Sequence, residues 1–374
     1  MRDLFTDATL SARSANSGPP RIVLSTPSSL PLLFVLLCVG GAFGQGIPSP
    51  SPEAQIARAD ELLRLGQPKD ALTILNQLAD SAPNTAYLEA RIGKAYYQSS
   101  QFQPAVTHLK AALQNDGSDA ESMQLLALSY FVLSQYAEAL PLLEKLGPRL
   151  SGSGPDGPYL LASCYVMTQR WENARTTYAN LLSLAPDSAI AYLMFGKFLV
   201  RQRLENRAVP EIQAALDRDP RIAMAHFLLG EIELYKGDGQ AAVEEFHKEL
   251  AINPSVWLVY WRLGDAYVRL EKYNEAEKVL KQAVWLNETT SGPYILLGQV
   301  ALKRDNPALA AVYLERAVRL DAQNDYVHYF LGKAYMGVGR TTEANQHFAI
   351  AKQLRNNRRA DEQSVSQQIR ETVE

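Results

Sequence analysis

The sequence predicts an all-α protein, folded as an α-solenoid of antiparallel helix pairs. Two observations lead to this prediction. An alanine recurs every 34 residues, except for one step of 35 between Ala139 and Ala174. Twelve residues before each of these alanines stands a glycine or a further alanine. A fixed period in this range is typical of a small structural unit stacked on itself. The recurring alanines are Ala71, Ala105, Ala139, Ala174, Ala208, Ala242, Ala276, Ala310 and Ala344.

Each repeat is predicted to hold two helices, with the small residue on the first helix and the recurring alanine on the second. We expect the small residue to face the alanine, so that the two backbones approach closely. In four repeats a proline follows the second helix and ends it, because proline lacks the backbone N–H of the next helical bond. The nine repeats begin near residues 52, 86, 120, 155, 189, 223, 257, 291 and 325.

This pattern resembles the tetratricopeptide repeat family over residues 52 to about 358. Five repeats also carry a tyrosine three residues after the small position, which fills the wedge beside the helix contact. The resemblance implies a right-handed superhelix whose first helices line a concave groove. The sixth repeat departs from the pattern, because Glu233 replaces the tyrosine and Glu249 replaces a later small residue. We interpret this departure as a locally altered groove.

The chain is predicted to have five segments. The boundary between the third and fourth repeats is placed in the glycine-, serine- and proline-rich stretch 146–158, where the 35-residue step falls and where the array is expected to flex. After the last repeat, Val365, Ile369 and Val373 are spaced four apart, which suits a short helix covering the last apolar face. The segments are residues 1–44, a signal peptide or anchor; 45–51, a Pro/Ser linker; 52–154, repeats one to three; 155–358, repeats four to nine; and 359–374, a polar capping helix or a disordered tail.

The N-terminal segment has the order of a secretory signal. Arginines precede an apolar run at residues 30–44, which ends in small residues, with a cleavage site expected before Gln45. The run is too short to span a bilayer comfortably, which takes about 20 residues. Asp3 and Asp7 are unusual in a signal peptide, so a membrane anchor formed by residues 30–44 stays open as an alternative. We expect export, to a periplasm or as a secreted protein.

Composition argues against a nucleic-acid partner. The 37 lysines and arginines nearly balance the 40 aspartates and glutamates, so the chain has no overall basic character. A short basic cluster from Lys352 to Arg359 is interpreted as cations near the C-terminal end of the last repeat helix, where the helix dipole favours them. Cys164 lies at helical spacing beside two leucines and is expected to be a buried, unreactive thiol.

No motif of a known catalytic centre is present. The sequence lacks a phosphate-binding loop, a His-Glu-x-x-His motif, a Cys-x-x-Cys pair and a Gly-x-Ser-x-Gly elbow. The five histidines are His108, His226, His247, His328 and His347, and they are spread over several repeats. We therefore predict no metal site, no cofactor and no enzymatic activity.

The resemblance places partner-binding residues on the first helices, at four positions around the small residue. Rigid aromatic rings beside lysine and arginine are typical of binding hot spots, although the same rings can simply fill the wedges between repeats. Neither the Lys–Asn pattern of chaperone-tail clamps nor an asparagine ladder is present. The candidate groove residues are Lys94, Tyr97, Lys197, Arg201, Phe227, Glu231, Tyr235, Trp261, Asp265, Arg269, Lys303, Tyr329 and Lys333.

These observations predict a non-catalytic scaffold or adaptor that holds a protein or peptide partner in the groove. Two alternatives stay open: a structural subunit that positions a catalytic partner in an enzyme complex, and a membrane-anchored assembly factor of the cell envelope. Contact with a membrane would come only from the N-terminal segment, if it is not cleaved. The identity of the partner and the oligomeric state are open, because one frame of this kind serves unrelated functions.

Overall fold

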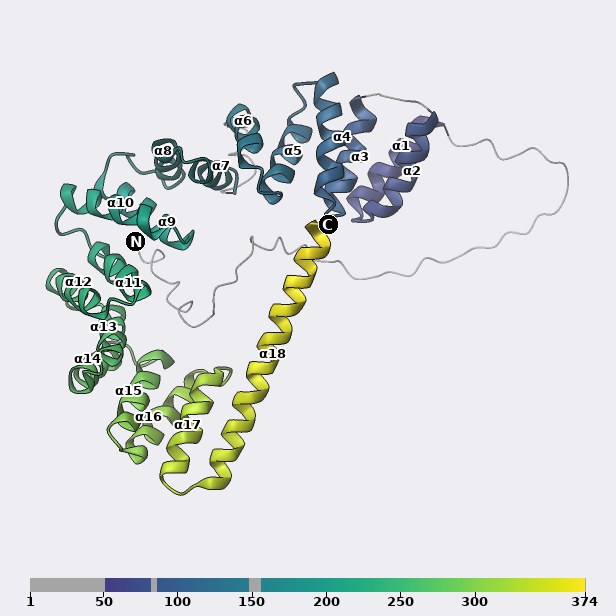
Figure 1. Cartoon of the computed structure of the whole chain (residues 1–374). Coiled ribbons are helices and arrows are strands. Elements are labelled where there is room, and N and C mark those ends of the chain that lie inside the picture. The colour runs from purple at the N-terminus through teal and green to yellow at the C-terminus, as the bar shows by residue number, and fades with distance from the viewer. Residues whose placement is uncertain (1–50, 82–85, 148–155, 374) are drawn as a thin grey trace. The chain divides into compact units, whose positions relative to one another are not determined.

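A computed structural model of the chain describes residues 51–81, 86–147 and 156–373, and within these ranges every regular element is an α-helix (Figure 1). The predicted signal or anchor, nearly all of the Pro/Ser linker and most of the stretch 146–158 lie outside the described residues. Among the residues that are described, no helix is both long enough and apolar enough to cross a membrane.

The helices follow one another in pairs, one pair to each predicted repeat. The pairs are α1 (Pro52–Arg64) with α2 (Pro68–Ser81), α3 (Ala86–Gln98) with α4 (Phe102–Asn115), α5 (Ala120–Val132) with α6 (Tyr136–Leu146), α7 (Asp156–Met167) with α8 (Trp171–Leu181), α9 (Ala189–Arg201) with α10 (Glu205–Arg218), α11 (Ala225–Lys236) with α12 (Gly239–Ile252), α13 (Trp257–Arg269) with α14 (Tyr273–Leu286), α15 (Ser291–Lys303) with α16 (Pro307–Leu320), and α17 (Asp325–Gly337) with α18 (Thr341–Val373). This order confirms the predicted fold class.

The chain divides into two compact units between Ser129 and Tyr130, inside α5. The first unit holds α1 to α4 and most of α5, and the second holds α6 to α17 with α18 as far as Thr372. The predicted boundary between repeats three and four falls within the second unit.

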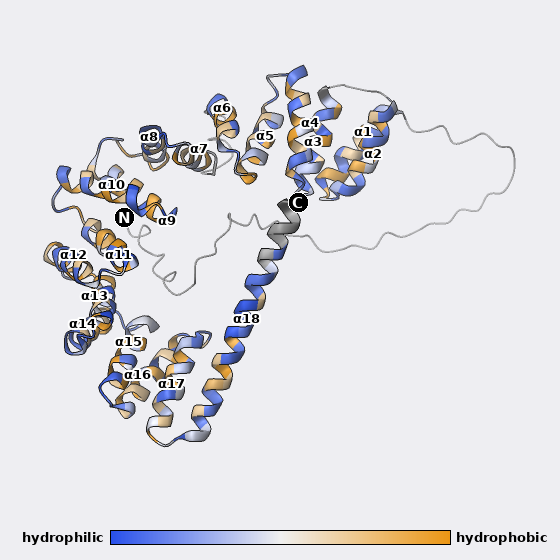
Figure 2. Ribbon diagram, in the orientation of Figure 1, coloured by the Kyte–Doolittle hydropathy of each residue, from blue (hydrophilic) through white to orange (hydrophobic). Residues whose placement is uncertain are grey.

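The core of each repeat lies between its two helices, where the buried apolar residues are found. Figure 2 shows hydrophobic and hydrophilic residues alternating along these helices. Every recurring alanine is fully buried, as a close helix contact requires. However, the recurring alanine is not the residue that lies closest to the small residue. A Cβ added at Gly264 would lie 2.4 Å from Leu280 Cδ2, and one at Gly93 would lie 2.6 Å from Leu109 Cγ. The residue that needs the glycine is therefore the large one four positions after the alanine, because residues i and i+4 share a helix face.

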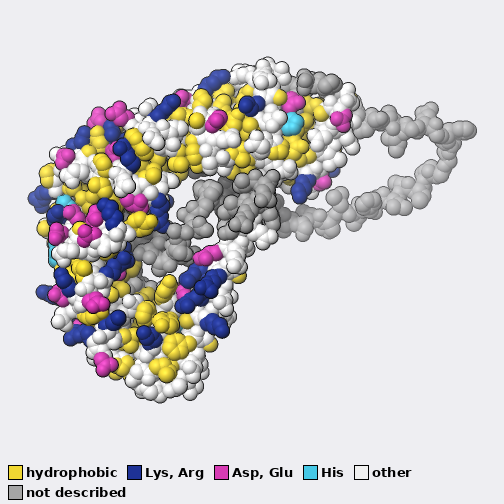
Figure 3. Space-filling model, viewed as in Figure 1, with side chains coloured by type: hydrophobic (Ala, Val, Ile, Leu, Met, Phe, Trp, Pro, Cys, Tyr) yellow, Lys and Arg dark blue, Asp and Glu magenta, His cyan; other side chains and the backbone are white. Residues whose placement is uncertain are grey.

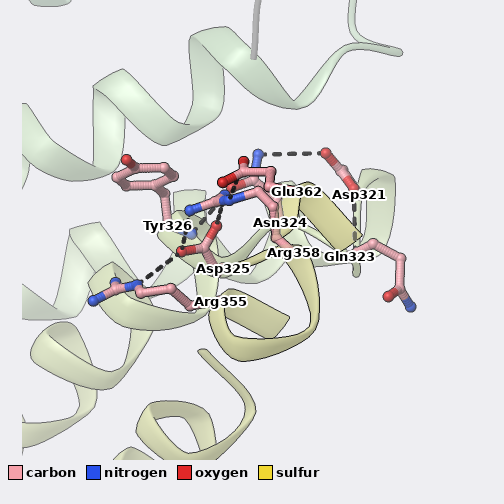
Figure 4. A network of polar contacts seen from close by, with 8 residues as sticks. All are labelled: Asp321, Gln323, Asn324, Asp325, Tyr326, Arg355, Arg358 and Glu362. Atoms are coloured by element: carbon pink, nitrogen blue, oxygen red, sulfur yellow. Dashed lines mark hydrogen bonds and ion pairs between the residues drawn. The ribbon is translucent and has the colours of Figure 1, made fainter. Parts of the chain in front are cut away.

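The last helix, α18, does not end near the basic cluster, so the interpretation of that cluster as C-terminal cations is wrong. The helix continues to Val373. Arg355 and Arg358 instead reach back to Asp325, which lies almost fully buried in the first turn of α17 (Figure 4). A capping role was predicted for Val365, Ile369 and Val373. The side chains of these residues lie outside the part of the chain that the structure describes.

Glu249 in α12 lies in the core, so the altered groove predicted from it is not found at this residue. Its side chain is completely buried and accepts hydrogen bonds from the backbone N–H groups of Met224, at 2.7 Å, and Phe227, at 3.3 Å. Met224 precedes α11 in a left-handed conformation, with φ of +73°, and its side chain makes no capping hydrogen bond. Glu249 therefore caps α11 from the neighbouring helix and supplies a negative charge at its positive end.

Cys164 is fully buried in α7, as predicted. Burial raises the pKa of its thiol to about 12, so the thiol stays protonated at neutral pH.

Candidate partner-binding surface

The candidate surface is formed by the first helices of repeats five to nine, all in the second unit. In Figure 1, α9, α11 and α13 lie on one side of their partners α10, α12 and α14. Each of these first helices also contacts the next one along the chain, from α9 through α11, α13 and α15 to α17. Their exposed and half-exposed side chains make one continuous surface, which we call the first-helix surface.

Two carboxylates and two arginines form an ion-pair network on α11 and α13. Arg262 Nε lies 2.5 Å from Glu231 Oε1, and Arg262 Nη1 lies 3.1 Å from Asp265 Oδ2. Arg269 Nη2 lies 3.2 Å from the same Asp265 oxygen, and Arg269 Nη1 donates to the carbonyl oxygen of Leu234 at 3.3 Å. Burial raises the pKa of the Glu231 carboxyl, and the facing Arg262 partly offsets this effect. Both carboxylates are thus neutralised from within the protein.

The structure brings together Glu231, Asp265 and Arg269 of the candidate groove residues. Arg262, at the centre of the network, was missed because it lies two residues before Gly264, a position that the family pattern does not assign to the groove. A signal for it exists in the sequence. Arg262 stands three residues before Asp265, and oppositely charged residues at this helical spacing pair with one another.

Trp261 lies in the wedge between α13 and α15. Its ring stacks on that of Trp257, with centroids 5.9 Å apart and planes 14° from parallel. It also packs against Gly292 so closely that an added Cβ there would lie 2.3 Å from Trp261 Cζ2. Trp261 is half-buried against the core and shows only part of its ring, which makes it a structural wedge, and its role in binding stays a prediction.

Two tyrosines of the first-helix surface are well exposed, and each lies near a cation. Tyr235 at the end of α11 is 65% exposed, with the Arg203 guanidinium 5.4 Å from its ring centre. Tyr329 on α17 is 40% exposed, with Lys333 Nζ 5.8 Å from its ring centre. Rings presented in this way offer a partner an apolar face beside a positive charge.

Three further cations of this surface have no carboxylate partner among the described residues: Lys197, Arg201 and Lys303. Lys197 is half-exposed, and the other two are exposed. Since Glu231 and Asp265 are already neutralised, the first-helix surface carries a local excess of positive charge. Elsewhere on the face seen in Figure 3, basic and acidic side chains are interspersed.

Three predicted groove residues lie elsewhere. Phe227 is only 7% exposed and packs against Phe246, so its ring belongs to the core and the prediction for it is wrong. Lys94 and Tyr97 lie in the first unit. Lys94 Nζ is 2.6 Å from Glu121 Oε1, and Tyr97 meets Phe102 edge to face, where burial raises the pKa of the tyrosine hydroxyl.

The described residues contain no group of three or more histidine, cysteine, aspartate or glutamate side chains placed to hold a metal ion. The histidines meet other residues in pairs. His108 contacts Glu89, His226 contacts Glu245, and His328 contacts His347.

Family models match most of the predicted repeats. Models described as tetratricopeptide repeat match residues 52–77, 193–256, 259–290 and 295–359. A model of the anaphase-promoting complex, cyclosome, subunit 3 matches residues 98–181.

Among curated proteins, tetratricopeptide repeat protein 21A of Mus musculus is 24% identical over 314 residues, which cover 82% of this chain and 22% of that protein. Anaphase-promoting complex subunit 3 of Schizosaccharomyces pombe is 21% identical over 283 residues, covering 76% of this chain and 42% of that one. The chain thus spans less than half the length of either relative.

Among solved structures, MamA aligns with a TM-score of 0.41 and 21% identity, over 44% of this chain and 96% of MamA. The APC/C heterotetramer Cut9–Hcn1 aligns with a TM-score of 0.40 and 18% identity, over 76% of this chain and 56% of that one. The phased repeats, the helix pairs that they form and the family models that match them agree, and the chain belongs to the tetratricopeptide repeat family.

Proposed function

We propose that this protein is a non-catalytic scaffold that holds an extended segment of a partner protein on the first-helix surface. One observation carries the proposal. The first helices of consecutive repeats present exposed tyrosines and unpaired cations at related positions, while their own carboxylates are neutralised by Arg262 and Arg269. Aromatic and arginine side chains are the residues most often found at the centre of protein–protein interfaces.

The repeat geometry favours an extended partner. Arg201, Tyr235, Arg269 and Lys303 occupy the same position, five residues after the small residue, in four successive repeats. Such a row offers contacts at regular intervals along a segment that crosses the first helices, as expected for a solenoid surface. Curated relatives include a subunit of the anaphase-promoting complex and a member of the BBSome complex, which supports a role in holding proteins together.

The test uses two double variants that are matched in chemistry. Tyr235→Ala with Lys303→Ala removes an exposed ring and an unpaired cation from the first-helix surface. Trp285→Ala with Lys278→Ala removes an exposed ring and an exposed lysine from the second helix α14, where Trp285 is 77% exposed. Partners are recovered by affinity purification from the native source and quantified by mass spectrometry. We expect the first variant to lose a partner that the second retains, and equal recovery by both would reject the first-helix surface as the binding site.

We also propose that the chain is exported, on the strength of the basic, apolar and small-residue order at its N-terminus. Mass spectrometry of the natural protein tests this. A mature chain beginning near Gln45 supports export with cleavage, whereas a chain that keeps residues 1–44 favours the anchored assembly factor.

The second candidate function, a structural subunit of an enzyme complex, predicts that the same affinity purification recovers an enzyme in a fixed ratio to this chain. The partner would then supply all of the catalytic residues. An enzyme whose recovery falls with the Tyr235→Ala/Lys303→Ala variant would favour this alternative over a general adaptor.

A further inference from the structure

Two imidazoles meet inside the last repeat. His328 on α17 is almost fully buried, and its Nδ1 lies 2.8 Å from Nδ1 of His347 on α18. The two rings are close to parallel, with planes 24° apart and centroids 5.1 Å apart. The second ring nitrogen of His328, Nε2, lies 3.0 Å from the carbonyl oxygen of Ala322. Both nitrogens of His328 are therefore engaged.

These contacts determine where the protons lie. A carbonyl oxygen only accepts, so His328 Nε2 must carry a hydrogen and donate it to Ala322. In neutral His328 the other nitrogen, Nδ1, is then an acceptor, and His347 Nδ1 donates to it. His347 can take one further proton on its own Nε2 without loss of this bond. A second proton, on His328 Nδ1, would place two N–H groups and two positive charges face to face at 2.8 Å.

The surroundings also disfavour positive charge on the pair. Tyr335 of α17 lies against His347 with ring centroids 5.5 Å apart, and its hydroxyl donates to Glu315 of α16 at 2.9 Å. Arg340, before α18, pairs with both Glu315 and Glu343. Burial lowers the pKa of His347. The charges of His328 and Arg340 lower this pKa further, whereas those of Glu343 and Glu315 raise it, and the net effect is a lowered pKa.

The same position in two other repeats has the opposite chemistry. His226 Nδ1 lies 2.7 Å from Glu245 Oε2, and His108 Nδ1 lies 2.7 Å from Glu89 Oε2. In all three repeats the two partners are 19 residues apart. Protonation of a histidine that faces a carboxylate creates an ion pair and strengthens the contact. Only the last of these three contacts pairs a histidine with a histidine, so acid acts against it alone.

We propose that the His328–His347 contact is an acid-sensitive latch, which holds α17 and α18 together at neutral pH and releases when both imidazoles are protonated. Among the described residues, α17 contacts α15 and α16 of the preceding repeat, and single units of a repeat array can open locally. Release therefore opens α17 and α18 while the repeats before them stay folded. Tyr329 and Lys333 share α17, so acid would also disrupt the C-terminal end of the first-helix surface. The latch itself rests on the fold and not on the proposed function.

Hydrogen exchange of the full chain, followed by mass spectrometry at pH 7.5 and pH 5.5 and corrected for the intrinsic exchange rates, tests the latch. Peptides from 325–351 should open severalfold more often at pH 5.5 than at pH 7.5, because protonation of the pair opposes the contact between its two Nδ1 atoms. Peptides from 225–252, which contain the His226–Glu245 contact, should show no such increase. Equal behaviour of the two regions in the natural protein would overturn the proposal without any variant.

Two variants and a matched control separate the latch from a general effect of acid. His347→Asn keeps a donor for His328 but does not titrate, and His328→Asn removes the other imidazole. Each should lose the acid-induced opening of 325–351. His226→Asn removes a histidine from the equivalent place in repeat six and should leave that opening unchanged. If either of the first two variants is protected like the natural protein at pH 7.5 and still opens at pH 5.5 as much as the natural protein does, the latch is wrong.

Discussion

Asp325 accepts a hydrogen bond from Arg358 Nη1 at 2.7 Å, although the two residues are 33 apart in the chain and lie on different helices (Figure 4). Arg355 Nε lies 3.2 Å from the other Asp325 oxygen. Asp325 is only 4% exposed, whereas both arginines are partly open to solvent. Water could therefore solvate the arginines if Asp325 were removed, but it could not solvate Asp325 if the arginines were removed.

The first prediction follows from this asymmetry. Asp325→Ala leaves two arginines that water can solvate, and should lower the stability of the last repeat by about 1–3 kcal/mol. Arg355→Ala with Arg358→Ala leaves a buried carboxylate without its cations, and should lower that stability by about 3–5 kcal/mol. Hydrogen exchange of residues 341–351 gives both free energies. A double arginine variant that is no less stable than Asp325→Ala would contradict this account.

The second prediction concerns the close contact between α13 and α14 in the seventh repeat, which we call the seam. Gly264→Ala places a methyl group against Leu280, whose side chain is fully buried, and should destabilise the protein by about 1–3 kcal/mol through overpacking. The better helix propensity of alanine, about 1 kcal/mol, offsets only part of this. Denaturant unfolding measures the change.

A double-mutant cycle provides the control for the seam. In a Leu280→Ala background the added methyl group meets vacated space, so Gly264→Ala should there be neutral or stabilising. The two effects of Gly264→Ala should differ by at least about 1 kcal/mol, as expected for residues in direct contact. Simple additivity would mean that Gly264 and Leu280 do not form the close contact.

Repetition explains why so much of the fold could be predicted. The first helices of seven repeats begin at the residues that the alanine spacing indicated, namely 52, 86, 120, 189, 257, 291 and 325. Each packing requirement of the helix pair is written several times in the sequence, so chance residues at one repeat do not hide it. The partner of the small residue was still misplaced, because spacing alone does not show which of two residues one helical turn apart meets the glycine.

Contacts that occur once could not be predicted in this way. Glu249, Arg262 and the His328–His347 pair each depend on which side chains happen to meet across two helices. Phe227 was placed in the groove because the family resemblance assigns its position there. Tyr329 at the same position is 40% exposed, yet the ring of Phe227 turns into the core against Phe246. A repeat position determines where the Cα atom of a residue lies. Whether its side chain is buried depends on the side chains around it.

The third prediction concerns the capping of α11 by Glu249. Glu249→Ala leaves the buried N–H groups of Met224 and Phe227 without an acceptor and should destabilise the protein by about 1–3 kcal/mol. Glu249→Gln keeps one carbonyl acceptor and should lose less. Thermal or denaturant unfolding measures both. Glu233→Ala is the control, since Glu233 forms an ion pair with the nearby surface residue Lys236, and its removal should change stability by less than about 0.5 kcal/mol.

The fourth prediction follows from the buried thiol of Cys164. In the folded protein burial raises the pKa of this thiol to about 12, from an ordinary value of 9.0. Between these values the unfolded chain loses its proton and the folded chain keeps it, so stability is complete below pH 9 and falls as the pH rises. At pH 10 the expected loss is about 1 kcal/mol, from one unit of difference in proton binding.

The variant Cys164→Ala isolates this contribution from that of the tyrosines, which also titrate at high pH. Its stability at neutral pH will be lower because a cavity is left, but its decline between pH 8.5 and pH 10 should be shallower than that of the natural protein by about 1 kcal/mol. Urea unfolding at a series of pH values gives the two slopes. Parallel slopes would mean that the thiol ionises as readily in the folded protein as in the unfolded chain, and rapid alkylation of the folded protein at pH 8 would lead to the same conclusion.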